Sequence, residues 1–175
     1  MAYIAKAVAN EFLHLVKDEG RSVTPMQLLK LAYFAYGWHW ALADARLINE
    51  RVQAWKYGPV IPSIYHEFKA FGNDPIDSFA TEWTPVHKGG KFIIQSQEPR
   101  IPECDDFPLR LVRRVWEVYG QYTAIQLSQM THEPGTPWAE TPNREVKGTP
   151  IDDGLIKAYF LQLAGRNDRE RPAAT

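Results

Sequence analysis

The chain has 175 residues with a single cysteine, Cys104, and its 20 Lys and Arg nearly balance its 21 Asp and Glu to give a formal net charge of -1. A chain of this length fits one domain that buries about 70% of the surface its unfolded form exposes, so it needs no stabilising disulfide. One cysteine cannot form an internal disulfide, which favours a reducing cytoplasm, and a balanced charge gives no overall field to gather nucleic acid.

The first predicted element is an amphipathic helix that ends at Gly20, because glycine readily adopts the left-handed conformation that ends helices. Its apolar residues recur at helical spacing: Ile4, Val8, Phe12, Leu15 and Val16. Polar residues interrupt the apolar run and distinguish it from a signal sequence: Lys6, Asn10, Glu11 and His14. No later run approaches a membrane span, which needs about 20 uninterrupted apolar residues, so we expect a soluble protein.

The second predicted helix begins after Thr24, which can cap it, with Pro25 in its first turn. Apolar residues cover it on two sides, and we expect it to end near Asp44. One stripe contains Leu28, Leu31, Ala35, Trp38 and Leu42, and the other contains Leu29, Tyr33, Tyr36 and Trp40. A helix that is apolar all round must be enclosed by protein, either by its own domain or by a partner.

A short extended segment is expected at residues 53–55, followed by a turn at Tyr57-Gly58-Pro59, whose glycine and proline favour one. The third helix is predicted to begin at Pro62 and to close at Gly72. Its inward side chains would be Ile64, Tyr65, Phe68 and Phe71.

The helical period vanishes after the third helix, and residues 86–94 predict a small antiparallel β hairpin. Gly89 and Gly90 can supply the positive φ angles of its tight turn. A fourth helix follows from Pro108 to Gly120. Its apolar face contains Leu109, Val112, Val115, Trp116 and Tyr119.

The fifth helix is short and ends after His132. Thr123 and Gln126 form a capping box at its start, since they are three residues apart. A last helix is predicted to open at residues 149–152 and to end at Gly165. Its inward residues would be Leu155, Ile156, Tyr159, Phe160 and Leu163.

These elements predict a mainly α fold: a single compact domain of about six helices with a small antiparallel β hairpin insertion, spanning residues 1–165. The polar residues 166–175 are expected to form a frayed C-terminal tail.

No motif for catalysis or cofactor binding emerges from the sequence. Neither His66 nor His132 begins an H-E-x-x-H pattern, which places two metal ligands one helical turn apart. Cys104 lies beside Asp105 and Asp106, an acidic setting that does not activate a thiol. The chain also lacks a G-x-S-x-G motif and a phosphate-binding glycine loop. We therefore predict a protein that is not an enzyme, with no catalytic residue, metal or cofactor.

Two other functions stay open at this stage. One is a small hydrolase or transferase that uses His66 and His132 with nearby carboxylates, since scattered acid and base groups can meet in a fold. The other is a DNA-binding regulator, because four arginines could form a strip for phosphates: Arg100, Arg110, Arg113 and Arg114. Arginines on the outer face of an amphipathic helix are more often only solvated, so we expect no nucleic acid partner.

Seven residues at or beside turns are the candidate contacts with a protein partner: Trp55, Lys56, Tyr57, Tyr65, His66, His132 and Trp138. Large rings at turns are hard to bury, and exposed Trp and Tyr fill much of an interface for little loss of rotamer freedom. The alternative is that these rings only close the ends of the core.

Three separate motifs resemble the Panacea antitoxin domain. They are T-P-M-Q-L-L-K-L-A-Y-F-A-Y-G-W-H from Thr24, A-W-K-Y-G-P-V-I-P-S-I-Y from Ala54 and L-S-Q-M-T-H-E-P-G-T-P-W from Leu127. They follow one another in the family's order, and the resemblance covers nearly the whole chain. The family includes the SocA-like antitoxins and the phage-associated GepA proteins, and residues 1–165 are identified as a Panacea-like domain.

The resemblance implies a mostly helical, non-enzymatic antitoxin that neutralises a cognate protein toxin, encoded nearby, by binding it. Delivery of the toxin to a protease is a variant of this mechanism. Members of the family are paired with unrelated toxin types, so the family does not name the toxin, and self-association is left open. The family supplies no catalytic residues to carry over, and the seven candidate contacts rest on aromatic exposure alone.

Overall fold

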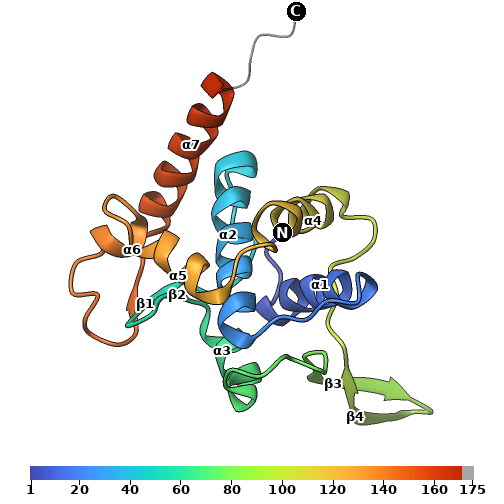
Figure 1. Cartoon of the computed structure of the whole chain (residues 1–175). Helices are drawn as coiled ribbons and strands as arrows, with labels where there is room; N and C mark the ends of the chain where they lie inside the picture. The colour runs from blue at the N-terminus through green and yellow to red at the C-terminus, as the bar shows by residue number, and fades with distance from the viewer. Residues whose placement is uncertain (171–175) are drawn as a thin grey trace, which may run out of the picture.

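The structure is a computed structural model that describes residues 1–170. Seven α-helices lie within these residues: α1 (Ala5–Asp18), α2 (Pro25–Ala43), α3 (Pro62–Phe68), α4 (Asp106–Tyr119), α5 (Ala124–His132), α6 (Pro137–Glu140) and α7 (Asp153–Glu170). The strands are β1 (Gln53–Trp55), β2 (Gly58–Val60), β3 (Glu82–Lys88), β4 (Lys91–Gln97) and β5 (Thr149–Pro150), and the 3-10 helix η1 (Lys69–Phe71) follows α3. The predicted fold class, a compact and mainly α domain with a small antiparallel hairpin, is confirmed (Figure 1).

Helix α2 is the central element of the core (Figure 1). The Thr24 hydroxyl accepts a hydrogen bond from the Gln27 amide at 3.4 Å, and Asp44 ends the helix in the left-handed conformation at φ 51°. Helices α4, α5 and α7 pack against α2, and both of its apolar stripes are buried over most of their length. The domain itself therefore encloses this helix, except near its end, where Leu42 is 57% exposed.

A glycine in the middle of α2 allows α7 to approach closely. A β-carbon built at Gly37 would lie 2.1 Å from Cε2 of Phe160, whose side chain is fully buried. That ring also meets Tyr33 edge-on, with the ring centroids 5.9 Å apart. Glycine weakens a helix by about 1 kcal/mol relative to alanine, and the tight packing of α2 on α7 explains its presence here.

A small antiparallel sheet with the strand order β2–β1–β5 contains the predicted extended segment. Gln53 of β1 pairs with Val60 of β2 on one side and with Pro150 of β5 on the other. The turn between β1 and β2 lies at residues 56–57, one residue earlier than predicted. The shift arises because Gly58 already pairs with the last residue of β1.

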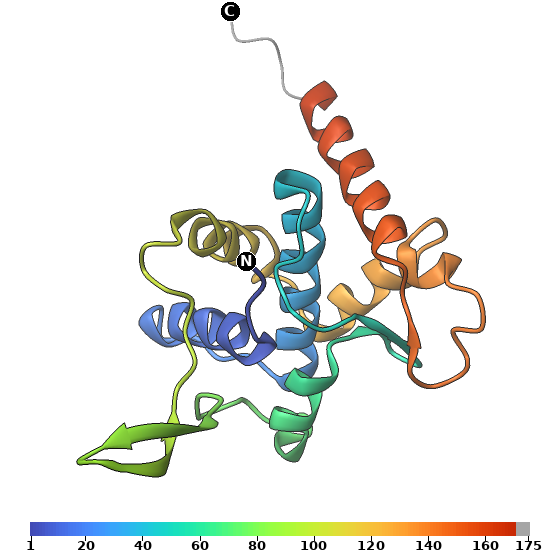
Figure 2. The same cartoon turned by 180° about the vertical axis from the view of Figure 1, so that it is seen from behind.

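Strands β3 and β4 form the predicted hairpin, which is longer than residues 86–94. Seven residue pairs join the strands, and Gly89 and Gly90 turn the chain at φ 58° and 77°. Both views show the hairpin projecting from the helical body on the side opposite α6 and α7 (Figures 1 and 2). Trp83, Phe92 and Ile94 lie on one face of it and are 69%, 79% and 73% exposed.

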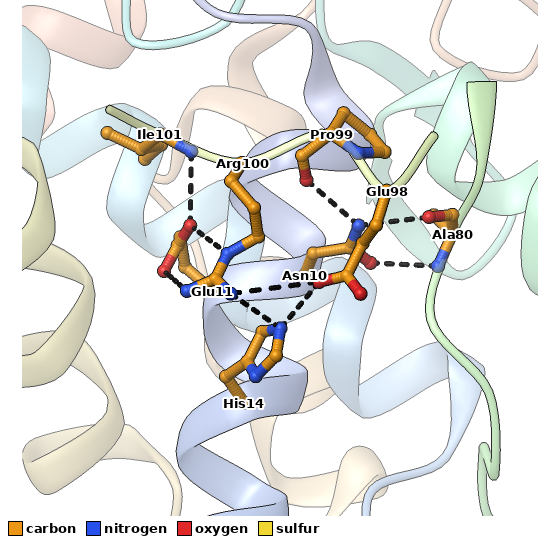
Figure 3. A network of polar contacts seen from close by, with 8 residues as sticks. All are labelled: Asn10, Glu11, His14, Ala80, Glu98, Pro99, Arg100 and Ile101. Carbon is orange, nitrogen blue, oxygen red and sulfur yellow. Dashed lines mark hydrogen bonds and ion pairs between the residues drawn. The ribbon is translucent and has the colours of Figure 1, made fainter. Parts of the chain in front are cut away.

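A buried asparagine of α1 holds the base of this hairpin (Figure 3). The Asn10 amide nitrogen donates to the carbonyl oxygens of Ala80 and Pro99, each at 3.0 Å, and the Asn10 amide oxygen accepts from the Ala80 amide at 2.8 Å. Ala80 precedes β3 and Pro99 follows β4, so one side chain joins both ends of the hairpin to α1.

Glu11, the next residue of α1, extends this network (Figure 3). Its carboxylate accepts hydrogen bonds from the Arg100 guanidinium at 2.8 and 3.0 Å and from the Ile101 amide at 3.0 Å. His14, one turn further along α1, pairs with Glu98 at 2.5 Å. The hairpin is therefore fixed at its base, while its apolar face stays open to solvent.

The last helix differs from the prediction at both ends. Strand β5 occupies two residues that were expected to open it, and α7 begins after Asp152, whose carboxylate accepts from the Leu155 amide at 3.2 Å. At the other end α7 continues through Gly165, so residues 166–170 of the predicted frayed tail are helical. Glycine lowers helix stability without preventing a helix. Residues 171–175 of that tail lie outside the described residues.

Smaller differences concern helix starts and one side chain. Helix α6 was not predicted because four residues are too few for an apolar period, although the Thr136 hydroxyl caps it by accepting from the Ala139 amide at 3.3 Å. Helix α4 begins two residues before Pro108, which is tolerated in the first turn. Leu155 was expected to face inward but is 36% exposed.

Within residues 1–170, no helix combines the length and the apolarity needed to cross a bilayer.

Candidate functional site

A groove of about 910 Å³ gathers five of the seven predicted contact residues: Trp55, Lys56, Tyr57, Tyr65 and Trp138. The start of α2, the β1–β2 turn, α3 with the turn after it, and α6 with its following loop all contribute to its lining. Aliphatic contacts come from Met26, Leu29 and Val60, and cations come from Lys30, Lys56, Lys69, Arg144 and Lys147. We call it the aromatic groove. Its volume is at the upper end of typical ligand sites, which span about 300–1,000 Å³.

Three rings of the aromatic groove are fixed to one another. The Trp138 indole nitrogen donates to the Trp55 carbonyl oxygen at 2.8 Å, which joins α6 to β1. The Trp55 and Tyr65 rings meet edge-on, with centroids 4.7 Å apart and an interplanar angle of 63°. The Trp55 indole nitrogen donates to the Gln53 side-chain oxygen at 2.9 Å. These contacts hold the rings in place before any ligand arrives.

A buried lysine supports the β1–β2 turn from inside the domain. Lys30 is 1% exposed as a residue, and its ammonium donates to the carbonyl oxygens of Tyr57 at 2.6 Å and Pro59 at 3.1 Å. Burial lowers the pKa of Lys30 from 10.5 to about 7, because the charged form loses its hydration inside the domain. The Ser128 hydroxyl of α5 donates to the same Tyr57 carbonyl at 3.1 Å.

Glycine is required where the turn enters β2. Gly58 has φ 101°, and a β-carbon built there would lie 2.6 Å from Lys30 Nζ and 2.6 Å from Thr131 Oγ1. Both the backbone conformation and the space therefore exclude a side chain. The position of the Lys56-Tyr57 turn depends on this close approach.

The two histidines of the predicted set do not line the aromatic groove. His132 packs on Trp138 with the ring centroids 4.1 Å apart, and its Nδ1 lies 2.6 Å from the Ser128 carbonyl oxygen. His66 is exposed on α3 and meets the Tyr65 ring edge-on at 5.3 Å. His132 therefore contacts a groove residue without lining the groove, and His66 lies outside it.

The hydrolase or transferase alternative depends on the surroundings of His66 and His132. Both His132 ring nitrogens face main-chain carbonyl oxygens, with Nε2 lying 3.4 Å from that of Lys56. The hydrolase or transferase alternative pairs these histidines with nearby carboxylates, and among the described side chains neither His132 nor His66 forms such a pair. In the part of the chain that the structure describes, no group of three or more His, Cys, Asp and Glu could hold a metal ion.

Comparison with known proteins assigns the chain to a family. The family model for the SocA-like antitoxins, the Panacea domain, matches residues 28–139. Antitoxin SocA of Caulobacter vibrioides (strain NA1000 / CB15N) is 32% identical over 160 residues, which cover 89% of this chain and 81% of that protein. The chain belongs to the Panacea family of SocA-like antitoxins. No solved structure is significantly similar to it.

The Panacea match contains all seven predicted contact residues as well as Lys30 and Gly58. It also contains the whole β3–β4 hairpin. The match ends before Arg144 and Lys147, which complete the groove from the loop after α6. The groove of this Panacea protein is therefore built from the matched region and completed by residues beyond it.

Three of the four arginines considered for DNA binding form ion pairs within this Panacea protein. Arg100 is paired with Glu11 at 2.8 Å, and Arg114 is paired with Glu117 at 3.0 Å. Arg110 forms an ion pair with Asp106 at 3.1 Å. These ion pairs reduce the positive charge that the strip offers to phosphates, most of all at Arg100, whose partner Glu11 is buried.

Of the cations that line the aromatic groove, the sequence predicted only Lys56. Arg144 and Lys147 lie in a polar loop, where nothing local indicates that their guanidinium and ammonium groups sit over the rings of Trp138 and Trp55. Lys30 did carry a readable signal, since a lysine within a helix that is apolar all round must find polar partners when buried. The open apolar face of the β3–β4 hairpin was also missed.

Proposed function

We propose that this protein is a cytoplasmic antitoxin that neutralises a protein toxin, encoded nearby, by binding it through the aromatic groove. The observation that carries the proposal is the convergence of Trp55, Tyr57, Tyr65 and Trp138 on one groove from separate elements. Tryptophan and tyrosine are the commonest energetic anchors of protein interfaces. Membership of the SocA-like antitoxin family supports the same function.

The proposed mechanism is steric and needs no chemical step. The toxin would bury the groove and its rim within an interface of about 1,600 Å² in total, which is typical of stable complexes. The hydrogen bonds and ring contacts that fix Trp55 and Trp138 reduce the entropy lost on binding. The bound antitoxin would cover the toxin's active site or the face that binds its target.

Co-expression tests the proposal directly. The product of the neighbouring gene should arrest growth when expressed alone, growth should recover when this protein is expressed with it, and the two proteins should purify as one complex. If the product is harmless alone, or if the two proteins separate during purification, the proposal fails.

The lifetime of the toxin separates two forms of neutralisation. Masking predicts that the toxin persists, bound and inactive, after protein synthesis is stopped. Delivery to a protease predicts that the toxin disappears faster when this protein is present and is stabilised in a strain without that protease. Either result is compatible with binding at the groove, but only the first makes binding sufficient for neutralisation.

A further inference from the structure

We propose that the aromatic groove accepts an acidic segment of the toxin that carries a bulky apolar side chain. This inference rests on the proposed function and specifies the chemistry of the partner. It follows from the charges, the rings and the aliphatic contacts that the groove presents together.

The exposed cations of the groove lack carboxylate partners. None of four lining cations forms an ion pair among the side chains that the structure describes: Lys56, Lys69, Arg144 and Lys147. Elsewhere in the molecule Arg46 is paired with Asp153 at 2.5 Å, and Lys6 is paired with Glu67 at 2.7 Å. Glu145 is the one carboxylate among the lining residues. A chain with a net charge of -1 thus concentrates positive charge in this groove.

Aromatic rings contact three of these four cations. The Lys147 ammonium lies 4.6 Å from the ring centroid of Trp55, and the Arg144 guanidinium lies 5.1 Å from that of Trp138. Lys56 lies 5.2 Å from the ring of Tyr57. Such contacts position a cation while leaving its other donors available. A carboxylate that enters the groove could accept hydrogen bonds from two or more of these groups.

The aliphatic lining favours a polypeptide over a nucleic acid strand. Single-stranded nucleic acid needs rings for base stacking along a continuous cationic track. Here Met26, Leu29 and Val60 add aliphatic surface beside the rings, and Glu145 interrupts the positive rim. An apolar side chain flanked by aspartate or glutamate satisfies both parts of the groove, since the side chain leaves water and the carboxylates meet the cations.

Charge reversal in the intact complex tests the inference. The double variant Arg144→Glu/Lys147→Glu should weaken the affinity for the co-purified toxin by about tenfold or more, with a smaller dependence of affinity on salt. The matched control is Lys88→Glu/Lys91→Glu, which makes the same change in net charge at the tip of the hairpin. The control should weaken binding by less than about threefold.

Short overlapping peptides that tile the toxin sequence identify the segment. Peptides that bind the wild-type protein should contain acidic residues beside a large apolar residue, should quench tryptophan fluorescence, and should not bind the groove double variant. Reversal of those acidic residues to lysine in the toxin should restore binding to Arg144→Glu/Lys147→Glu.

The outcomes separate failure of the inference from failure of the proposed function. If a complex forms and both double variants bind alike, or the binding peptides are basic or uncharged, the inference is wrong while the function stands. A labelled single-stranded oligonucleotide that binds wild type and not the groove variant would reassign the groove to nucleic acid. A dimer of this chain that the groove variant abolishes would reassign it to a second copy. If no complex with the toxin forms at all, both proposals fail.

Discussion

The aromatic groove and the β3–β4 hairpin both present apolar side chains, but they differ in how firmly those side chains are held. In the groove Trp55 is half-buried, and its main-chain carbonyl accepts from Trp138 while its ring contacts Tyr65. On the hairpin Trp83 and Phe92 are 69% and 79% exposed. Exposure alone therefore does not single out a binding site. Side chains that are already fixed lose less freedom when a partner binds.

The backbones of the groove turn and of the hairpin are also held at different places. The groove turn is held by Lys30 and Ser128 at its centre, whereas the hairpin is held by Asn10 and Glu11 only at its base. A two-stranded hairpin alone is marginally stable in water. Buried polar contacts thus position the groove turn along its length and anchor the hairpin at one end.

The largest expected effect follows from the glycine that shapes the groove turn. Gly58→Ala should lower the free energy of unfolding by about 3 kcal/mol or more, because the methyl group meets Lys30 Nζ and Thr131 Oγ1 and the backbone has φ 101°. The control is Gly90→Ala at the hairpin tip, where φ is 77° but nothing lies within 4 Å. That variant should lose about 1 kcal/mol. Urea unfolding measures both, and equal losses would show that the groove turn is not tightly packed.

The hairpin anchor should give the next largest effect. Asn10→Ala should lower the free energy of unfolding by about 2–3 kcal/mol, since it removes three hydrogen bonds and leaves the buried Ala80 amide without a partner. Asn49→Ala is the matched exposed control and should change stability by less than about 0.5 kcal/mol. Hydrogen exchange should accelerate by more in β3 and β4 than in the groove turn, because local opening of the hairpin adds to the overall loss of stability. Uniform acceleration across both regions would contradict separate anchoring.

The parts of the fold that could be predicted from the sequence are those fixed by local contacts. Local chemistry marked the ends of α2 and α5: Thr24 and Asp44 bound the first, and Thr123 and Gln126 form the predicted capping box of the second. These signals act within one turn, so a single sequence reveals them. Gly89-Gly90 marked the hairpin for the same reason.

The candidate site could be predicted only in part because its contacts are distant in sequence. Trp55 and Trp138 were identified as ring-bearing turn residues, but the hydrogen bond that joins them spans 83 positions. Nothing near Lys147 in the sequence indicates that it packs over Trp55. His66 matched the same local pattern as the groove residues and yet lies outside the groove. Local sequence thus predicted the types of contact residue, and only tertiary packing decided which of them meet.

Two tryptophans test which region binds the toxin. Trp55→Ala should weaken toxin affinity by about 2 kcal/mol, or about 30-fold, because it removes a fixed anchor in the groove. Trp83→Ala removes a more exposed ring from the hairpin and should change the affinity by less than about threefold. Isothermal titration with the purified toxin measures both, and circular dichroism confirms that each variant is folded. The opposite order of effects would move the binding surface to the hairpin.

The smallest expected effect is a dependence of the free energy of unfolding on pH, which arises from the buried lysine beneath the groove turn. Burial depresses the pKa of Lys30 to about 7 from 10.5. Above pH 7 the folded state releases this proton while the unfolded state retains it, so the free energy of unfolding should rise by about 1–2 kcal/mol between about pH 7 and pH 9. Lys30→Met should abolish this rise, and the matched groove variant Lys69→Met, at an exposed lysine, should keep it.

The Lys30 side chain can also be followed directly in the wild-type protein, which covers the case in which Lys30→Met does not fold. The chemical shift of its ε-carbon should titrate near neutral pH, several units below that of an exposed lysine. Titration near the ordinary lysine value would mean that the carbonyl oxygens of Tyr57 and Pro59 solvate the ammonium fully. In that case charged hydrogen bonds from Lys30 would hold the groove turn in place. The predicted rise in the free energy of unfolding with pH would then be absent.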